Sequence, residues 1–322
     1  MSLDLSVFEA KGLAVPPARP PVAGTVDMFA SLAPAEDAMP DPMDLVRRGA
    51  MVIHNNSGGK DSQAQLIHMV EVLGIPPSQI VSIHADLGEC EWPGTEAHAR
   101  SIADFYGVPF YVTRAQNKEG EEKNLLDYAD KRGKFMDKAN RWCTSDWKRG
   151  PIRREINRLR RELAWPSPFV LNCMGMRSQE SIERAKLDEV EFVKDASCPS
   201  TAAWPAVVEA PTRASRRIHF DWHPILHYTE DQVFALIEAA GQEPHWAYKK
   251  GARRLSCLIC LFSSESDMRI AVESSDKGKA YARRIIEIEE KHDHTIMPLR
   301  KVGGKQVKRY VKDVVGDILD AA

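Results

Sequence analysis

Two short segments of the sequence hold residue types and spacings that can do chemistry. The first is a glycine-rich loop with hydroxyl and charged groups on both sides of its glycines, Ser57-Gly58-Gly59-Lys60-Asp61-Ser62. Glycines let a backbone approach an anion closely, while serine hydroxyls and a lysine add donors and positive charge. The second segment holds Cys257 and Cys260, whose spacing lets two thiolates reach one metal. The sequence therefore predicts a phosphate cradle and a metal or cluster site.

The glycine-rich loop stands between an expected strand and an expected helix. Apolar residues at 50–53 indicate a buried strand, and a helix ending at Gly74 is indicated by four apolar residues on one face, Leu66, Met69, Val70 and Leu73. In open parallel sheets, ligands bind where such loops leave the strands, and the helix directs its positive end there. The loop has neither the Walker nor the dinucleotide-binding glycine pattern. The plain alternative is an ordinary turn in which Asp61 or Ser57 caps the helix.

The middle of the chain alternates strands with helices. The expected elements are strands at 80–85, 109–112 and 169–174 and helices at 94–106 and 151–163. Strands that alternate with helices predict an α/β fold, a parallel twisted sheet flanked by helices. This α/β domain is expected to span residues 48–228, with an irregular insertion and short strands at 188–226.

The two ends of the chain differ from this pattern. Prolines in residues 1–47 predict a proline-rich tail without regular elements. Residues 229–322 predict a mainly helical C-terminal region that carries the cysteine pair, with helices at 229–240, about 264–291 and 306–320.

Charge and hydropathy limit the classes of function. The chain has 44 Lys and Arg against 46 Asp and Glu, so it lacks the overall basic excess of a dedicated nucleic-acid binder. We find no secretory signal and no run of about 18 apolar residues. We therefore expect a cytoplasmic protein that contacts no membrane, with its six cysteines kept as thiols for metal or redox chemistry.

The glycine-rich loop resembles the PP-loop of the ATP pyrophosphatase superfamily, whose members bind ATP and expose its α-phosphate to a nucleophile. Four more segments resemble, in order, motifs of its phosphoadenosine phosphosulfate (PAPS) reductase-like branch: 83–88, 141–152, 175–184 and 222–233. The resemblance covers roughly residues 49–265 and implies an adenine nucleotide α-hydrolase-like fold. The Cys-x-x-Cys at 257–260 is similar to that of the DndC-like and SspD-like proteins of DNA phosphorothioation. Reductases of the branch carry a catalytic cysteine near their C-terminus, whereas no cysteine follows Cys260 here.

The resemblance assigns roles to individual residues. It implies that the loop binds ATP and Mg²⁺ together with four residues outside it, Asp86, Lys148, Gly175 and Arg177. Catalysis would rest on four of these positions, Lys60, Asp61, Ser62 and Arg177. Arg177 would clamp a phosphate, for which a guanidinium fork is well suited. Arg184 would share a face with Arg177 if the segment is helical, and it fits either a second clamp or an ion pair with Glu180 or Glu183.

The resemblance also implies a 4Fe–4S cluster held by three cysteines, Cys143, Cys257 and Cys260. A fourth ligand stays open: Cys198 lies in an expected loop, Cys173 is expected in the core, and Cys90 is expected nearer the nucleotide. The alternatives are an open iron site, a labile cluster, no metal, or thiols that carry a transient persulfide.

The function implied by the resemblance is an ATP pyrophosphatase that adenylates an acceptor for sulfur transfer. The acceptor would be a DNA backbone phosphate, and a cysteine desulfurase would be a partner. One alternative is a sulfate-assimilation enzyme, either a PAPS reductase or similar to a sulfate adenylyltransferase, and another is a non-catalytic nucleotide-binding scaffold. Basic clusters at 213–217, 249–254 and 301–309 are expected to be solvated faces, although the second precedes Cys257 and could position a DNA phosphate.

Overall fold

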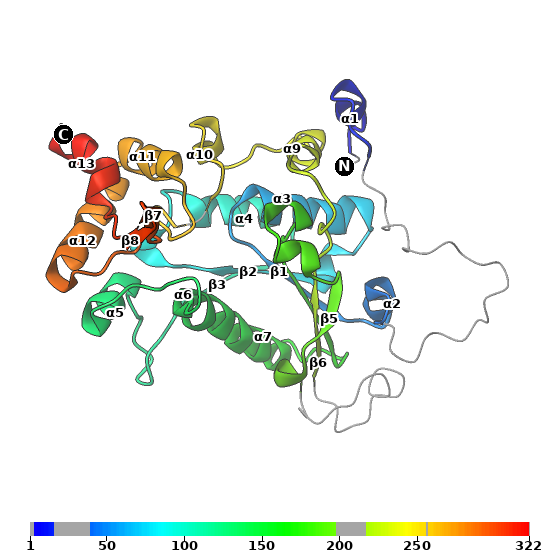
Figure 1. The fold of residues 1–322 in the computed structure, drawn as a ribbon. Coiled ribbons are helices and arrows are strands. Elements are labelled where there is room, and N and C mark those ends of the chain that lie inside the picture. The colour runs from blue at the N-terminus through cyan, green and yellow to red at the C-terminus, as the bar shows by residue number, and fades with distance from the viewer. Residues whose placement is uncertain (1–2, 16–38, 198–216, 256, 322) are drawn as a thin grey trace.

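A six-stranded sheet lies at the centre of the computed structural model, which describes residues 3–15, 39–197, 217–255 and 257–321 (Figure 1). The strand order is β3-β2-β1-β4-β6-β5, parallel from β3 to β6, with β5 antiparallel at one edge. The strands are β1 Met51–Asn55, β2 Ile80–Ala85, β3 Phe110–Thr113, β4 Phe169–Cys173, β5 Val190–Phe192 and β6 Ile218–Trp222. The expected parallel α/β fold is therefore confirmed, and β5 and β6 are the short strands expected at 188–226.

Helices cover both faces of this sheet (Figure 1). They are α1 Ser6–Ala10, α2 Pro42–Arg47, α3 Lys60–Ile67, α4 Thr95–Phe105, α5 Leu125–Arg132, α6 Trp142–Thr144, α7 Gly150–Glu162, α9 Glu230–Ala239, α10 Trp246–Lys249, α11 Glu265–Glu273, α12 Asp276–His292 and α13 Lys312–Asp320. Because side chains alternate along a strand, Val52 packs in the core shared with α3 and α4. Its neighbour Ile53 packs instead with Ile156 and Leu159 of α7.

The helix after the glycine-rich loop extends as far as the sequence predicts. α3 continues into one π-helical turn at His68–Val72. The chain then leaves the helix at Gly74, which has a φ of +68°, a left-handed conformation that glycine adopts without strain.

Two expectations for the C-terminal region are wrong in detail. The single helix expected at about 264–291 is broken between α11 and α12, because Ser275 accepts a hydrogen bond from the Gly278 N–H and starts a new helix. The start of the helix expected at 306–320 is a strand. An antiparallel hairpin is formed by two short strands, β7 Arg300–Val302 and β8 Lys305–Val307. Helix α13 begins only at Lys312. Gly303 and Gly304 make its turn with φ of +57° and +81°.

The N-terminal residues are also more regular than expected. Within 1–47, α2 begins with Pro42, and Asp41 caps it by accepting from the Met43 N–H. α1 buries Phe8 in the cluster formed by α3 and α9. Residues 16–38 and 198–216 lie outside the described part of the chain.

One core cluster joins the C-terminal helices to residues 87–147 (Figure 1). It contains Leu258 of the cysteine segment, Ile285 of α12 and Val315 of α13, together with Cys90 and Trp147. This packing brings the cysteine pair beside segments that follow β2 and β3. Among the helices in the described ranges, none combines the length and the apolar character needed to cross a bilayer.

Candidate functional site

The glycine-rich loop joins the end of β1 to the start of α3. Gly58 has a φ of +70°, and a Cβ there would lie 3.0 Å from the Thr95 carbonyl oxygen, so this position favours glycine. Asn56 accepts a hydrogen bond from the Gly58 N–H at 3.0 Å and donates to the Ala99 carbonyl at 2.7 Å. The N-cap residue of α3 is Gly59, which has no side chain to accept a capping hydrogen bond. The loop is therefore not the ordinary capped turn, with Asp61 or Ser57 as the cap, that was the plain alternative.

The two serine hydroxyls of the loop lie close to each other, and a buried, uncharged histidine packs nearby. The Oγ atoms of Ser57 and Ser62 lie 3.2 Å apart, and Ser62 Oγ donates to the Gly59 carbonyl at 2.9 Å. Below them, His54 donates from Nε2 to the Ser62 carbonyl at 2.8 Å, and its Nδ1 lies 3.1 Å from Ser82 Oγ. Burial lowers the pKa of His54 to about 4, so the imidazole is uncharged at neutral pH.

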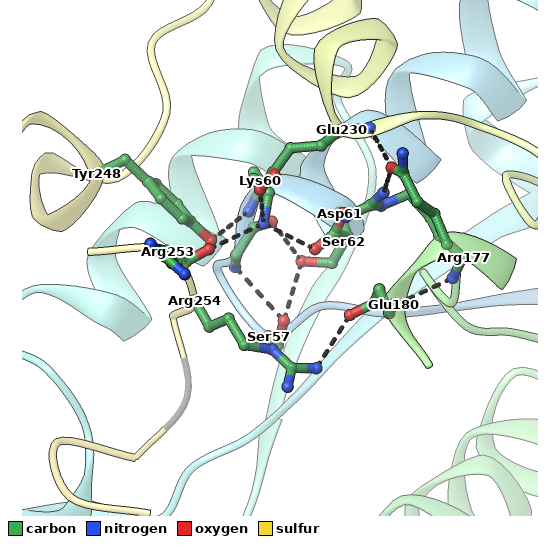
Figure 2. Close-up of polar contacts among 12 residues, drawn as sticks. Ser57, Lys60, Asp61, Ser62, Arg177, Glu180, Glu230, Tyr248, Arg253 and Arg254 are labelled. Carbon is green, nitrogen blue, oxygen red and sulfur yellow. Dashed lines mark hydrogen bonds and ion pairs between the residues drawn. The ribbon is translucent and has the colours of Figure 1, made fainter. Parts of the chain in front are cut away.

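Lys60 is almost fully buried, with 2% of its surface exposed. Its Nζ donates to the Arg253 carbonyl at 3.1 Å and lies 3.2 Å from a carboxylate oxygen of Glu230 and 3.4 Å from one of Asp61. Its backbone N–H donates to the Tyr248 hydroxyl at 3.0 Å. Figure 2 shows these residues around the loop, with Tyr248 reaching it from α10 and Arg253 from the chain that follows α10. Burial raises the pKa of Tyr248, so its phenol stays protonated.

Arg177 reaches the loop from the chain that follows β4 (Figure 2). Its Nε donates to Asp61 Oδ1 at 2.6 Å, and only 4% of Arg177 is exposed. The close approach of this segment to the start of α3 depends on Gly175. A Cβ there would lie 2.8 Å from the Asp61 backbone carbon and 2.9 Å from the Ser62 nitrogen. The structure thus brings Gly175 and Arg177 together with the loop, as the resemblance implies.

Glu180 organises further arginines beside Arg177. Its carboxylate accepts from the Arg177 N–H at 3.1 Å, lies 3.0 Å from Arg254, and also pairs with Arg184. Burial, followed by the charges of Arg254, Arg177 and Arg141, lowers the pKa of Arg184, although Asp61 opposes this. Three guanidinium groups, those of Arg177, Arg184 and Arg254, therefore pair with two carboxylates, Asp61 and Glu180, and the excess positive charge suits a polyanion.

The segment that carries these residues is not one helix. It forms two short 3₁₀ turns at Ser178–Glu180 and Arg184–Lys186. The shared helical face considered for Arg177 and Arg184 is therefore absent, while the ion pair between Arg184 and Glu180 is present.

Asp86 lies at the end of β2, where it pairs with Arg114 and accepts from the Gly88 N–H at 2.7 Å. Burial opposes its charge, but the Gly88 bond and Arg114 outweigh burial and lower the pKa of Asp86. Ligand atoms of His84, Asp86 and Glu91 all lie within 4.8 Å of one another. Two carboxylates suit Mg²⁺, whereas the imidazole is a ligand that softer divalent cations favour.

Lys148 lies beside the cysteines. Burial works against its charge, but its strongest charged neighbours, Cys257, Cys260, Cys143 and Glu91, outweigh burial and raise the pKa of Lys148. An ammonium group here would stabilise thiolates, and thiolates are the form that binds metals.

The three predicted cysteine ligands gather at one place. Cys143 and Cys257 pack against the same core cluster, and both have Cys260 among their charged neighbours. Cys173 is buried in β4, where its Sγ donates to the Leu171 carbonyl at 3.5 Å, as expected of a core residue. Cys198 lies outside the described residues.

Among the described residues, no three cysteine sulfurs lie within 4.8 Å of one another. Four thiolates around zinc would lie about 4 Å apart, given Zn–S bonds of about 2.3 Å. Among the described residues, the one set of three ligand atoms found within 4.8 Å of one another contains no cysteine. The donor type suits an iron–sulfur cluster, in which each thiolate binds a different iron.

Several residues of the site carry no clear signal in the sequence. Tyr248 and the Arg253 carbonyl reach the loop from 188 and 193 residues away. In the sequence, Arg254 stands out only as part of the basic cluster at 249–254. Its ion pair with Glu180 is a tertiary contact that no local pattern predicts. A local pattern cannot predict which distant tyrosine covers a loop.

A known protein family matches the part of the chain that holds the glycine-rich loop and the three predicted cysteine ligands. Residues 51–262 match the phosphoadenosine phosphosulfate reductase domain family. An uncharacterised 37.8 kDa protein of Escherichia phage 186 is 27% identical over 144 residues, which span 45% of this chain and 36% of that relative.

Solved structures match the chain at low sequence identity and low TM-score. The PAPS reductase of Candida auris is 15% identical and has a TM-score of 0.40, covering 67% of this chain and 88% of its own. The U34-tRNA thiolase NcsA of Methanococcus maripaludis, solved with its [4Fe-4S] cluster, is 17% identical. Its TM-score is 0.37, and the match covers 84% of this chain and 86% of that one.

Proposed function

Because the chain belongs to the phosphoadenosine phosphosulfate reductase domain family, we propose that it is an ATP pyrophosphatase that adenylates an acceptor for sulfur transfer. The observation that supports this most is the meeting of the glycine-rich loop with Arg177 at the ends of neighbouring strands β1 and β4. Backbone, hydroxyl, ammonium and guanidinium groups from two strand ends converge there, which is the chemistry that a triphosphate requires.

ATP would bind with its β- and γ-phosphates on the loop. The Ser57 and Ser62 hydroxyls would turn from each other to phosphate oxygens, and Lys60 would exchange its contact with the Arg253 carbonyl for one with phosphate. Arg177 would face the α-phosphate. Asp86 and Glu91 offer carboxylates that would hold Mg²⁺, which would neutralise charge on the phosphates.

In the reaction, an oxygen of the acceptor attacks the α-phosphorus of ATP. The bond between that phosphorus and the α–β bridging oxygen breaks, and the electron pair leaves with pyrophosphate. AMP is left attached to the acceptor oxygen. The chain would act by positioning and charge neutralisation, and no protein nucleophile is required. Lys60 and Arg177 would stabilise the charge that develops on the leaving pyrophosphate and on the transferred phosphoryl group.

The acceptor that we favour is a DNA backbone phosphate. Adenylation turns one of its oxygens into a leaving group, and a sulfur nucleophile supplied through a cysteine desulfurase partner would then displace AMP. Arg141 and Arg254, exposed beside the loop, supply positive charge for a second phosphate. Cys143, Cys257 and Cys260 would hold a cluster, which would supply a soft, thiolate-bound iron site for sulfur chemistry.

A second candidate is sulfate chemistry, which the family match favours. In that case, the same arginines would bind sulfate or its adenylated form, and duplex DNA would have no effect on turnover. A nucleotide-binding scaffold would instead bind ATP without forming AMP.

The test is to incubate anaerobically purified protein with Mg²⁺ and α-labelled ATP, alone, with sulfate, and with duplex DNA. We expect AMP as the labelled product, formed faster with DNA and lost in Ser62→Ala. The matched control is Ser101→Ala, which removes an exposed hydroxyl that bonds within α4 and should leave turnover unchanged. Stimulation by sulfate alone would establish the second candidate, and ATP binding without AMP in any mixture would contradict both.

A further inference from the structure

Cys90 is held against the cysteine pair by backbone contacts. Its carbonyl accepts a hydrogen bond from the Leu258 N–H at 2.8 Å, and Glu91 forms a β-bridge with Cys257. The 3₁₀ turn Gly88–Cys90 is therefore fixed beside the Cys-x-x-Cys segment. Lys277 of α12 donates to the Gly88 carbonyl at 3.0 Å and strengthens this attachment.

Shared neighbours link Cys90 to all three predicted ligands. The hydroxyl of Tyr281 contacts the Cys90 thiol and has Cys257 and Cys260 as charged neighbours. Cys257 in turn lies within electrostatic range of Cys260, Cys90 and Cys143. Cys90 lies in the same core cluster against which Cys143 and Cys257 pack, so thiols from three separate segments of the chain lie in one part of the fold.

We propose that Cys90 is the fourth thiolate of a four-cysteine iron–sulfur site, with Cys143, Cys257 and Cys260 as the other three. The donor set is then complete within this chain, since a 4Fe–4S cluster takes one thiolate per iron. The part that the cluster takes in sulfur transfer rests on the proposed function. The binding of iron by these thiols does not require ATP cleavage, so the two ideas can fail separately.

The same segment also connects this site to the glycine-rich loop. His84 contacts Glu91 at 3.2 Å through Nε2 and donates from Nδ1 to the Asn56 carbonyl at 2.8 Å. A cluster bound by Cys90 would therefore be connected to the start of the glycine-rich loop through Glu91 and His84.

The experiment is anaerobic reconstitution of the full chain with ferrous iron and sulfide, without ATP, followed by iron and sulfide analysis and Mössbauer and EPR spectroscopy. We expect about four irons per chain in the wild type. Cys90→Ser and Cys90→Ala should fall to about three irons or fewer, with the EPR signal of a three-iron cluster or no cluster. Cys173→Ser, which alters a buried cysteine in β4, should match the wild type.

Two results would overturn the proposal. One is full iron content and an unchanged Mössbauer spectrum in both Cys90 variants. The other is a wild-type chain that binds one zinc, or no metal, under the same conditions. Thermal unfolding of the metal-free variants controls for folding, and because serine is nearly isosteric with cysteine, Cys90→Ser decides the question if Cys90→Ala does not fold.

Discussion

The hydroxyl of Tyr248 accepts a hydrogen bond from the backbone N–H of Lys60 at 3.0 Å. The Tyr248 side chain, which comes from the end of the Trp246–Lys249 helix, thus lies against the first turn of α3. A phosphate oxygen bound there would accept the same hydrogen bond. The chain that follows Tyr248 leads directly to Cys257. Nucleotide binding and the cysteine segment are therefore connected through one short piece of backbone.

Tyr248→Phe should bind ATP more tightly. The variant keeps the ring that lies 5.3 Å from Lys60 Nζ but removes the acceptor with which phosphate competes. A net hydrogen bond of about 1 kcal/mol predicts an affinity up to about fivefold higher. Isothermal titration with a non-hydrolysable ATP analogue measures this. Tyr228→Phe, which removes a buried hydroxyl bonded to His68, is the control and should leave affinity unchanged. Weaker binding by Tyr248→Phe would show that the phenol contacts the nucleotide.

Asp61→Asn should destabilise the fold. It removes the charged partner of Arg177, which is 4% exposed and would be left as a buried cation without its carboxylate. We expect the free energy of unfolding to fall by about 3 kcal/mol in urea titrations. Asp44→Asn, in the exposed ion pair with Arg47 on α2, should change it by less than about 1 kcal/mol. Equal effects of the two substitutions would mean that burial does not set the strength of the Arg177 pair.

Gly175→Ala should impair both stability and nucleotide binding. Its new Cβ would lie 2.8 Å from backbone atoms of Asp61, which cannot move without shifting the loop. Overpacking of this kind costs about 1–3 kcal/mol. Gly316→Ala is the control, because the nearest atom to its Cβ would be the flexible Lys312 side chain at 3.5 Å and a helix position favours alanine. A Gly175→Ala protein with wild-type Tm and ATP affinity would refute the close contact between β4 and the loop.

His54 should make stability fall as the pH is lowered. Its pKa is lowered to about 4 in the folded chain, so between pH 6.5 and 4 the unfolded chain binds the proton and the folded chain does not. This difference reduces the free energy of unfolding by up to about 3 kcal/mol across that range. The free energy of unfolding should depend less steeply on pH in His54→Gln. In His227→Gln, which changes an exposed histidine, the dependence should equal that of the wild type. An identical slope in all three proteins would contradict the neutral buried imidazole.

The β7–β8 hairpin should contribute to DNA binding if DNA is the acceptor. Lys301 and Lys305 stand on an exposed antiparallel hairpin that also carries Arg300. Lys301→Gln combined with Lys305→Gln should weaken DNA binding and reduce the slope of log affinity against log salt by about 2. The same double change at Lys118 and Lys131 is the control, and ATP turnover without DNA should not change. If the slope of log affinity against log salt concentration did not change, the hairpin would not contact the DNA.

The glycine-rich loop and the sheet could be predicted from the sequence because their signals are local. Four runs of apolar residues, at 50–53, 80–85, 109–112 and 169–174, correspond to β1 to β4, and the pattern after Ser62 gave α3. The two wrong helix assignments also have local causes. Ser275 restarts a helix where one continuous helix was expected, and the hairpin that turns at Gly303-Gly304 places a strand at the start of the helix expected at 306–320.

The rest of the site depends on contacts between distant segments. Nothing near Cys90 in the sequence indicates that it lies beside Cys257, because the bridge between Glu91 and Cys257 joins residues 166 positions apart. The cover of Tyr248 over Lys60 is likewise a result of how α10 packs. Short motifs predict which groups a site offers, and tertiary packing decides which of them meet.

The measurement that tests the central claim most directly is phosphorus NMR of ATP incubated with the full chain, Mg²⁺ and each acceptor. The account predicts that AMP and pyrophosphate appear in equal amounts, with the AMP first attached to the acceptor, and that Ser62→Ala abolishes both signals. ADP and inorganic phosphate as the main products would place the cleavage between the β- and γ-phosphates and would contradict the account.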